Sequence, residues 1–270
     1  MLKSSVLLFA AGLSLGAWGA MSPDAHSAPE ASLPPEWALT VSHASESVPP
    51  TATRSRMASG LALQSFQQRA ARQLNEPVSY SANTVVKAEL PDTSQKGEYQ
   101  LRRRFIAPKT LLFTPLRFVG DNFVKSHVIA RLLQAEVDHA SKGESVRTAI
   151  NDANYKFSYK GLDEIDDCVV HVFQVKPRGK RPGLFKGRIY LDASNGSLRR
   201  AEGTLVKTQS FFIKKIDFSQ DYADINGYTL PVHVRSLAKT RLVGRAAVEI
   251  ATDAYDLDTS ANADTPTGSQ

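Results

Sequence analysis

Alternation of apolar and polar residues, with a period of two, constrains the fold of this chain more than any other feature. It begins in residues 78–90, "VSYSANTVVKAEL", and continues in residues 98–106 and 109–120. Seven further runs follow residue 154, and most are separated by short turns such as Asn226-Gly227. Turns this short join only antiparallel neighbours, because a parallel crossover needs about a dozen residues or more. The sequence therefore predicts an antiparallel sheet of about ten strands.

The first three runs predict which side chains share a face of this sheet. In residues 98–106, Tyr99, Leu101 and Phe105 fall on one face, and Gln100, Arg102 and Arg104 fall on the other. The run at residues 109–120 is apolar on both faces, so we expect it to be deeply covered. One face of residues 78–90 carries the following side chains: Tyr80, Ala82, Thr84, Val86, Ala88 and Leu90.

Two amphipathic helices are expected beside the strands. Residues 61–74 place Leu63, Phe66, Ala70 and Leu74 at helical spacing. A second helix should begin after an N-cap at Asp121 and run to residue 140. Its apolar stripe consists of Val124, Val128, Leu132 and Ala135. Because every apolar face needs a partner layer, we predict an α+β fold in which the sheet curls and the helices cover its concave face.

The two ends of the chain differ in composition from the middle. Residues 1–20 have a basic start, a short apolar run and small residues at the end, which is typical of a cleaved signal peptide. Residues 21–58 are rich in Pro, Ser and Ala and predict a disordered linker, and residues 258–270 predict a disordered tail. Residues 59–257 have the length of one globular domain. We therefore expect an exported protein that resides in the periplasm.

Two carboxylates, Asp192 and Glu202, flank a predicted hairpin turn at Asn195-Gly196. An acid/base pair needs two carboxyls held apart by the geometry of the substrate, so a solvated charge pair, with Arg199, Arg200 and Lys186 as neighbours, is the favoured explanation and an acid/base site the less favoured one. The single cysteine, Cys168, excludes an internal disulfide and is interpreted as a small buried apolar residue, with a nucleophile as the less favoured alternative.

The histidines and glycines give no stronger indication of catalysis. His127 and His139 lie twelve residues apart on one predicted helix without the spacing of a zinc pair, and His171 and His233 fall on separate strands. The chain contains no Gly-x-Ser-x-Gly elbow and no glycine-rich phosphate loop. We therefore predict a non-enzymatic protein with no metal and no cofactor.

Two later segments resemble the outer-membrane lipoprotein-sorting proteins. These are "FKGRIYLDASNGSLRRAEG", residues 185–203, and "IKKIDFSQDYADINGYTLPVHVRS", residues 213–236, and the resemblance extends over roughly residues 76–257. It implies an unclosed antiparallel barrel with a helical lid. Relatives of this kind include the periplasmic carrier and the outer-membrane receptor of lipoprotein sorting, and a periplasmic regulator of an anti-sigma factor.

Two functions follow as expectations. The first is a monomeric binding protein for an acyl chain, lipid or lipoprotein held between sheet and lid. Its cavity would be lined by Phe105, Phe113, Phe118, Phe123, Val128, Leu132, Phe173, Ile189, Phe212, Phe218 and Val232. The second is an envelope protein-interaction or stress-sensing module without a lipid. An open apolar cavity would favour the first, and a filled core with an exposed apolar patch would favour the second.

The formal net charge of +6 adds a further expectation about partners. In the periplasm the abundant anions are lipid head groups rather than nucleic acid, so an anionic membrane surface is a candidate partner. Basic residues on the outer face of a sheet also maintain solubility and discourage edge pairing, and this second explanation stays open.

Overall fold

The computed structural model describes residues 56–143, 145–208, 213–241 and 244–258. Ten strands form one antiparallel sheet in the order β3-β2-β1-β10-β9-β8-β7-β6-β5-β4. In chain order the strands are β1 (Ser79–Leu90), β2 (Gln95–Ile106), β3 (Thr110–Gly120), β4 (Tyr155–Ile165), β5 (Cys168–Pro177), β6 (Phe185–Asp192), β7 (Leu198–Leu205), β8 (Ile213–Ile225), β9 (Tyr228–Thr240) and β10 (Arg245–Asp258).

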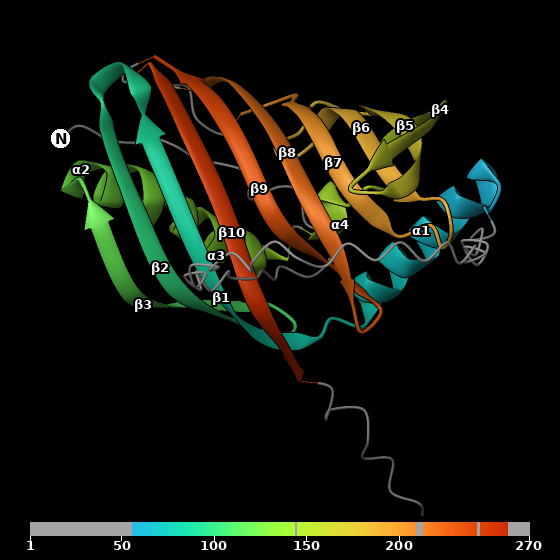
Figure 1. The fold of residues 1–270 in the computed structure, drawn as a ribbon, viewed down its shortest axis with the longest axis horizontal. Helices are drawn as coiled ribbons and strands as arrows, with labels where there is room; N and C mark the ends of the chain where they lie inside the picture. The colour runs from blue at the N-terminus through green and yellow to red at the C-terminus, as the bar shows by residue number, and fades with distance from the viewer. Residues whose placement is uncertain (1–55, 144, 209–212, 242–243, 259–270) are drawn as a thin grey trace, which may run out of the picture.

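The sheet remains open, with β3 at one edge and β4 at the other (Figure 1). Only one ladder, β1 with β10, joins strands that are distant in sequence, because every other neighbouring pair is consecutive along the chain. The predicted antiparallel half-barrel of about ten strands is therefore confirmed.

The helices lie on one side of the sheet, behind the strands in Figure 1. α1 (Ser59–Asn75) precedes β1, and a single 3-10 turn, η1 (Pro91–Thr93), joins β1 to β2. Between β3 and β4 the chain forms α2 (Asn122–Val124), the π-helix η2 (Lys125–Ile129), α3 (Ala130–Lys142) and α4 (Ser145–Thr148). We refer to residues 122–142, which comprise α2, η2 and α3, as the lid.

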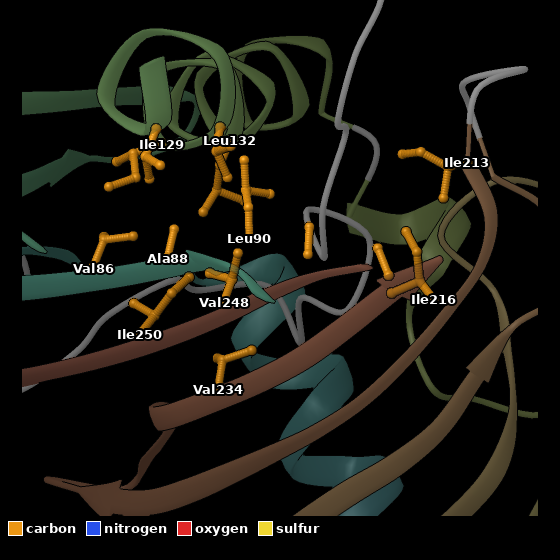
Figure 2. Close-up of a cluster of buried hydrophobic side chains, with 14 of the residues drawn as sticks. Val86, Ala88, Leu90, Ile129, Leu132, Ile213, Ile216, Val234, Val248 and Ile250 are labelled. Atoms are coloured by element: carbon orange, nitrogen blue, oxygen red, sulfur yellow. The ribbon is translucent and has the colours of Figure 1, made fainter. Parts of the chain in front are cut away.

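Alternation along the strands builds the core. All six predicted side chains of β1, from Tyr80 to Leu90, are buried. The stripe predicted for the second helix is buried as well, and in Figure 2 Ile129 and Leu132 extend from the helix toward Leu90 of β1. A separate buried cluster lies against α1 and includes Phe66, Phe185 and Tyr155. The concave face is thus covered by two different helical elements.

The structure corrects the prediction for β3. The run was expected to be deeply covered, but β3 is an edge strand that pairs only with β2. Leu112, Leu116 and Val119 are 49 %, 61 % and 54 % exposed. An apolar run on both faces is therefore no proof of burial when the strand ends up at the margin of a sheet.

The two termini need separate treatment. The predicted signal peptide, most of the linker and nearly all of the tail lie outside the described residues. Within the described residues, the Met57 N–H, which precedes α1, donates a 2.8 Å hydrogen bond to the Ala193 carbonyl oxygen. At the other end β10 continues to Asp258, one residue beyond the predicted boundary.

Candidate functional site

The seam between the lid and the sheet is the strongest candidate for a functional site. Val124, Val128, Ile129 and Leu132 are almost wholly inaccessible and pack against inner residues of β1, β2, β9 and β10. In this closed arrangement apolar side chains fill the seam (Figure 2). A ligand can enter the seam only if the lid moves.

One ion pair lies inside this apolar seam. Arg103 Nη2 of β2 donates to Glu136 Oε2 of α3 at 2.6 Å, and the two side chains are only 3 % and 2 % exposed. The guanidinium also lies over the Phe113 ring, 5.1 Å from its centroid. Removing two charges from water is costly, so this pair ties the lid to the sheet at a considerable desolvation penalty.

The pKa values of Glu136, Arg103 and Tyr80 are all shifted by burial and by the charges of the pair. Burial raises the pKa of Glu136 above its ordinary value, and Arg103 opposes that rise. Burial is the largest influence on Arg103 and disfavours its charge, yet Glu136, Tyr80 and Tyr255 together outweigh it, so the pKa of Arg103 is raised. Burial raises the pKa of Tyr80 beside Arg103. We infer an ionised pair, because a neutral Glu136 would leave the Arg103 charge buried without compensation.

The start of the lid is attached to the sheet. Asp121 accepts a 2.9 Å hydrogen bond from the Lys96 N–H through its carboxylate, and its own N–H donates to the Lys96 carbonyl oxygen at 2.9 Å. Asp121 does occupy the predicted N-cap position, but its side chain makes no capping hydrogen bond to the helix. The π-helical turn at Lys125–Ile129 follows directly, and such turns interrupt regular helix geometry, often at functional sites.

The helix α1 is attached differently. Gln73, buried, exchanges two hydrogen bonds with the backbone of Thr229, at 3.0 and 3.1 Å. Arg72 donates to the Gly227 carbonyl oxygen at 2.9 Å, and Ser65 donates to the Asn195 carbonyl oxygen at 2.9 Å. These contacts fix α1 to two hairpin turns of the sheet.

The predicted cavity residues divide between the two helical covers. Val128 and Leu132 belong to the cluster under the lid, and Phe118 and Phe113 pack against it. Phe173, Ile189 and Phe218 belong to the cluster under α1. Phe105 lies in a third cluster with Tyr80 and Leu111.

Three predicted residues lie elsewhere. Phe123 is 40 % exposed and stacks on His127 with ring centroids 4.5 Å apart. Val232 is half-buried on β9, and Phe212 lies outside the described residues. The ten predicted residues that the structure describes are thus divided between three buried clusters and two less buried positions.

The two carboxylates at the hairpin serve separate local contacts. Asp192 accepts hydrogen bonds from the N–H and hydroxyl of Ser194, whereas Glu202 accepts from the Tyr190 hydroxyl at 2.6 Å. His171 is buried between the Met57 carbonyl oxygen and the Tyr159 hydroxyl. Within the ranges that the structure describes, no group of three or more metal-binding side chains is found.

Several residues of the basic clusters are engaged in internal contacts. Arg178 donates to the Asp152 and Tyr155 carbonyl oxygens, and Arg200 pairs with Asp221.

Cys168 is only partly buried and lies 3.6 Å from an Arg199 nitrogen, rather than in the apolar core as predicted. Among the helices of the described segments, none combines the length and the apolarity needed to cross a membrane.

The ion pair under the lid was not predicted, although its signal was present. Strict alternation places Arg103 on the same face as Leu101 and Phe105, and Glu136 directly follows the striped residue Ala135. A charged residue on an apolar face indicates a buried partner, since unpaired buried charges are strongly disfavoured.

Comparisons with known proteins found one family model and several solved structures that are similar to this chain. A family model described as "Family of unknown function (DUF5686)" matches residues 150–255. None of the curated proteins compared with this chain matches it. Among solved structures, a LolA superfamily protein from Nitrosomonas europaea is 11 % identical, with 72 % of this chain and 92 % of that chain covered and a TM-score of 0.39.

Two further solved structures are similar. A DUF1329 family protein from Desulfovibrio piger is 10 % identical, with 73 % of this chain and 94 % of that chain covered and a TM-score of 0.36. The MucA/MucB complex of Pseudomonas aeruginosa matches at 10 % identity, covering 69 % and 93 % of the two chains with a TM-score of 0.23. In each case the similarity is one of fold, and the function must be argued from the residues of this chain.

Proposed function

We propose that the protein is a periplasmic, non-enzymatic binding protein that receives an acyl chain, as part of a lipid or lipoprotein, between the sheet and an opening lid. The observation that carries this proposal is the ion pair Arg103–Glu136, which is buried between lid and sheet beside Tyr80 and Tyr255. Burial of such a pair contributes little net stability compared with apolar packing. A seam needed only for stability would be better filled by apolar side chains.

Opening of the lid has a different free-energy cost at this ion pair than at the apolar contacts. When the lid moves away, both charges regain their hydration, which offsets part of the cost of separating them. The apolar side chains exposed at the same time would be covered again by the acyl chain. The pair therefore holds the lid in one register while limiting the cost of opening.

The attachments of the lid suggest how it moves. The contacts of Asp121 with Lys96 hold its beginning, and the π-helical turn directly after them is the irregular point about which α3 would swing. We propose that an acyl chain then contacts the predicted residues nearest this seam, which are Phe105, Phe113, Phe118, Val128 and Leu132. The predicted residues under α1 would stay in the core.

The test compares three forms of the full chain purified from the periplasm without detergent. The double variant R103M/E136L replaces the pair by apolar side chains, and R245M/D92L removes an exposed ion pair between the β1–β2 turn and the start of β10. Native mass spectrometry is expected to find a lipid mass that is released on denaturation. Uptake of a fluorescent fatty acid is expected to be slower in R103M/E136L and unchanged in R245M/D92L.

Two results would overturn the proposal. One is a clean mass for the protein together with no uptake of fatty acid or lipopeptide. The other is unchanged uptake by a folded R103M/E136L variant, which would show that the pair does not control access. Circular dichroism and thermal denaturation establish that both variants are folded before uptake is compared.

A second candidate function, an envelope protein-interaction module, is favoured by a separate observation. The closed core is filled, and the edge strand β3 exposes Leu112, Leu116 and Val119. Exposed apolar side chains that lie together often mark an interaction site. Under this alternative the partner binds outside the seam, and neither lipid mass nor fatty-acid uptake is expected.

A further inference from the structure

A cavity of about 580 Å³ lies where the beginning of β1 meets the ends of β2 and β10. It is separate from the lid seam, because its polar lining comes from the outer side chains of these strands. Those side chains alternate with the buried residues Tyr80, Ala82 and Phe105. The polar lining consists of Ser79, Ser81, Arg102, Arg104, Asp256 and Asp258. We call this cavity the dipolar cleft.

Strand register arranges opposite charges across the dipolar cleft. Ser81 of β1 is opposite Arg104 of β2 on one side and opposite Asp256 of β10 on the other. Neighbouring strands are about 4.8 Å apart, so the backbones of Arg104 and Asp256 are separated by roughly 10 Å. A cation and an anion thus face each other across a row that has a hydroxyl at its centre.

Arg104 and Asp256 do not form an ion pair with each other. Within the described ranges, neither Arg104 nor Asp256 takes part in an ion pair, whereas Arg200 with Asp221 and Arg69 with Asp224 do pair elsewhere on the protein. Arg102 donates a 3.0 Å hydrogen bond to the Ser81 hydroxyl and so orders the floor between them. The cleft keeps an acceptor wall and a donor wall apart, and both are open to solvent.

We propose that the dipolar cleft binds a zwitterion that carries a primary ammonium and a phosphate, as in the headgroup of an aminophospholipid. A guanidinium matches phosphate oxygens in a bidentate manner, and hydroxyls of Ser79 and Ser81 can donate to the same group. The ammonium would donate its hydrogen bonds to the Asp256 carboxylate. Each wall of the cleft then meets the charge that it complements.

The surroundings favour a headgroup in a membrane over a free zwitterion. Ile106, which lines the cleft, is 37 % exposed, and Leu112 of β3 lies opposite Arg104 in the β2–β3 ladder and is also exposed. Apolar side chains beside cationic ones suit the boundary between headgroups and acyl chains. This site goes beyond the proposed function, since it lies outside the seam and would bring the protein to a bilayer surface whatever the lid binds.

The experiment measures sedimentation of the full chain with vesicles of phosphatidylcholine alone, or of phosphatidylcholine mixed with phosphatidylethanolamine or with phosphatidylglycerol. We expect the phosphatidylethanolamine vesicles to be preferred, because only their primary ammonium can donate hydrogen bonds to Asp256. D256N should lose this preference, because it removes the carboxylate that accepts from the primary ammonium. R104Q should instead weaken binding to all of the vesicles about tenfold, since every one of these lipids carries the phosphate that Arg104 would contact. Soluble glycerophosphoethanolamine should compete only weakly, whereas strong competition would identify a free zwitterion as the ligand and overturn the membrane assignment.

Matched controls separate the site from general charge. R117Q removes a cation from the same sheet edge outside the cleft, and E164Q removes an anion from the exposed face of β4. Both should retain the preference. Equal binding to all vesicles, or equal losses in R104Q and R117Q, would overturn the proposal. R103M/E136L should keep the vesicle preference, so failure of the headgroup site and failure of the lid mechanism give different results.

Discussion

The two halves of the concave face are covered by helices that are held in different ways. α1 is anchored by hydrogen bonds from Ser65, Arg72 and Gln73 to the turns of the sheet, in addition to a cluster of aromatic residues. The lid is attached at its start by Asp121, and its further contacts with the sheet include an apolar stripe, the Lys125 ammonium over the Tyr99 and Phe118 rings, and one buried ion pair. Under the proposed function, this difference means that α1 stays in place while the lid opens.

The two edge strands of the sheet, β3 and β4, also differ in the side chains that they expose. The edge strand β4 exposes Tyr159 and Leu162 among charged residues such as Lys156, Lys160 and Glu164, and these charges discourage pairing with another strand. The edge strand β3 exposes apolar residues, but Pro115 lacks an N–H and the ladder register shifts beside it. β3 is therefore protected against strand addition while its side chains stay available for contact.

The largest expected effect concerns the ion pair under the lid. Glu136→Ala leaves Arg103 charged and buried, which should lower the free energy of unfolding by about 3–5 kcal/mol. The double variant R103M/E136L should be as stable as the wild type or more stable, because apolar packing replaces both charges. Urea denaturation of both variants measures this, and a double variant as unstable as the single one would mean that the pair itself is needed for folding.

An intermediate effect is expected for the anchor of α1. Gln73→Ala removes two hydrogen bonds and leaves the buried backbone groups of Thr229 without their partner, at a cost of about 1–3 kcal/mol. The same denaturation experiment should show this loss without any change in fatty-acid uptake. Altered uptake in this variant would indicate that α1 also moves, and the contrast between the two covers would be lost.

A small effect on stability but a clear effect on association is expected at β3. Leu116→Lys alters an exposed side chain, so the free energy of unfolding should change by less than about 0.5 kcal/mol. If β3 binds an envelope partner, cross-linking in cells should decrease for this variant and not for Leu162→Lys on β4. Equal cross-linking by both variants would exclude β3 as the contact surface.

The smallest effect concerns the turns beside β1 and β10. The Arg245 N–H and then its guanidinium lower the pKa of Asp92. The stabilisation from a lowered carboxyl pKa is present above the unfolded value, about 3.9, and is lost as pH falls through the folded value. Asp92→Asn should therefore lower the midpoint of thermal unfolding slightly near about pH 7 and hardly at all near about pH 2. A difference that persists in acid would indicate an effect unrelated to charge.

Local pattern predicted the strands and helices because each depends on neighbouring residues. The alternation in residues 78–90 and the helical stripe through Val128 and Leu132 both lead to the observed buried faces. The fate of β3 could not be predicted in this way, since an apolar run looks the same in the middle of a sheet and at its edge. The candidate cavity residues were chosen by type, and the structure divides them between two clusters according to the helix above each.

The antiparallel class, the sheet with amphipathic covers and the lack of a recognisable catalytic or metal motif could all be inferred from the sequence. The pairing of β1 with β10, the edge position of β3 and the contact of Arg103 with Glu136 could be seen in the three-dimensional structure alone. The physical reason is the range of the interactions. Periodicity is set by backbone geometry within a few residues, whereas strand order and buried pairs depend on contacts between segments that are far apart along the chain.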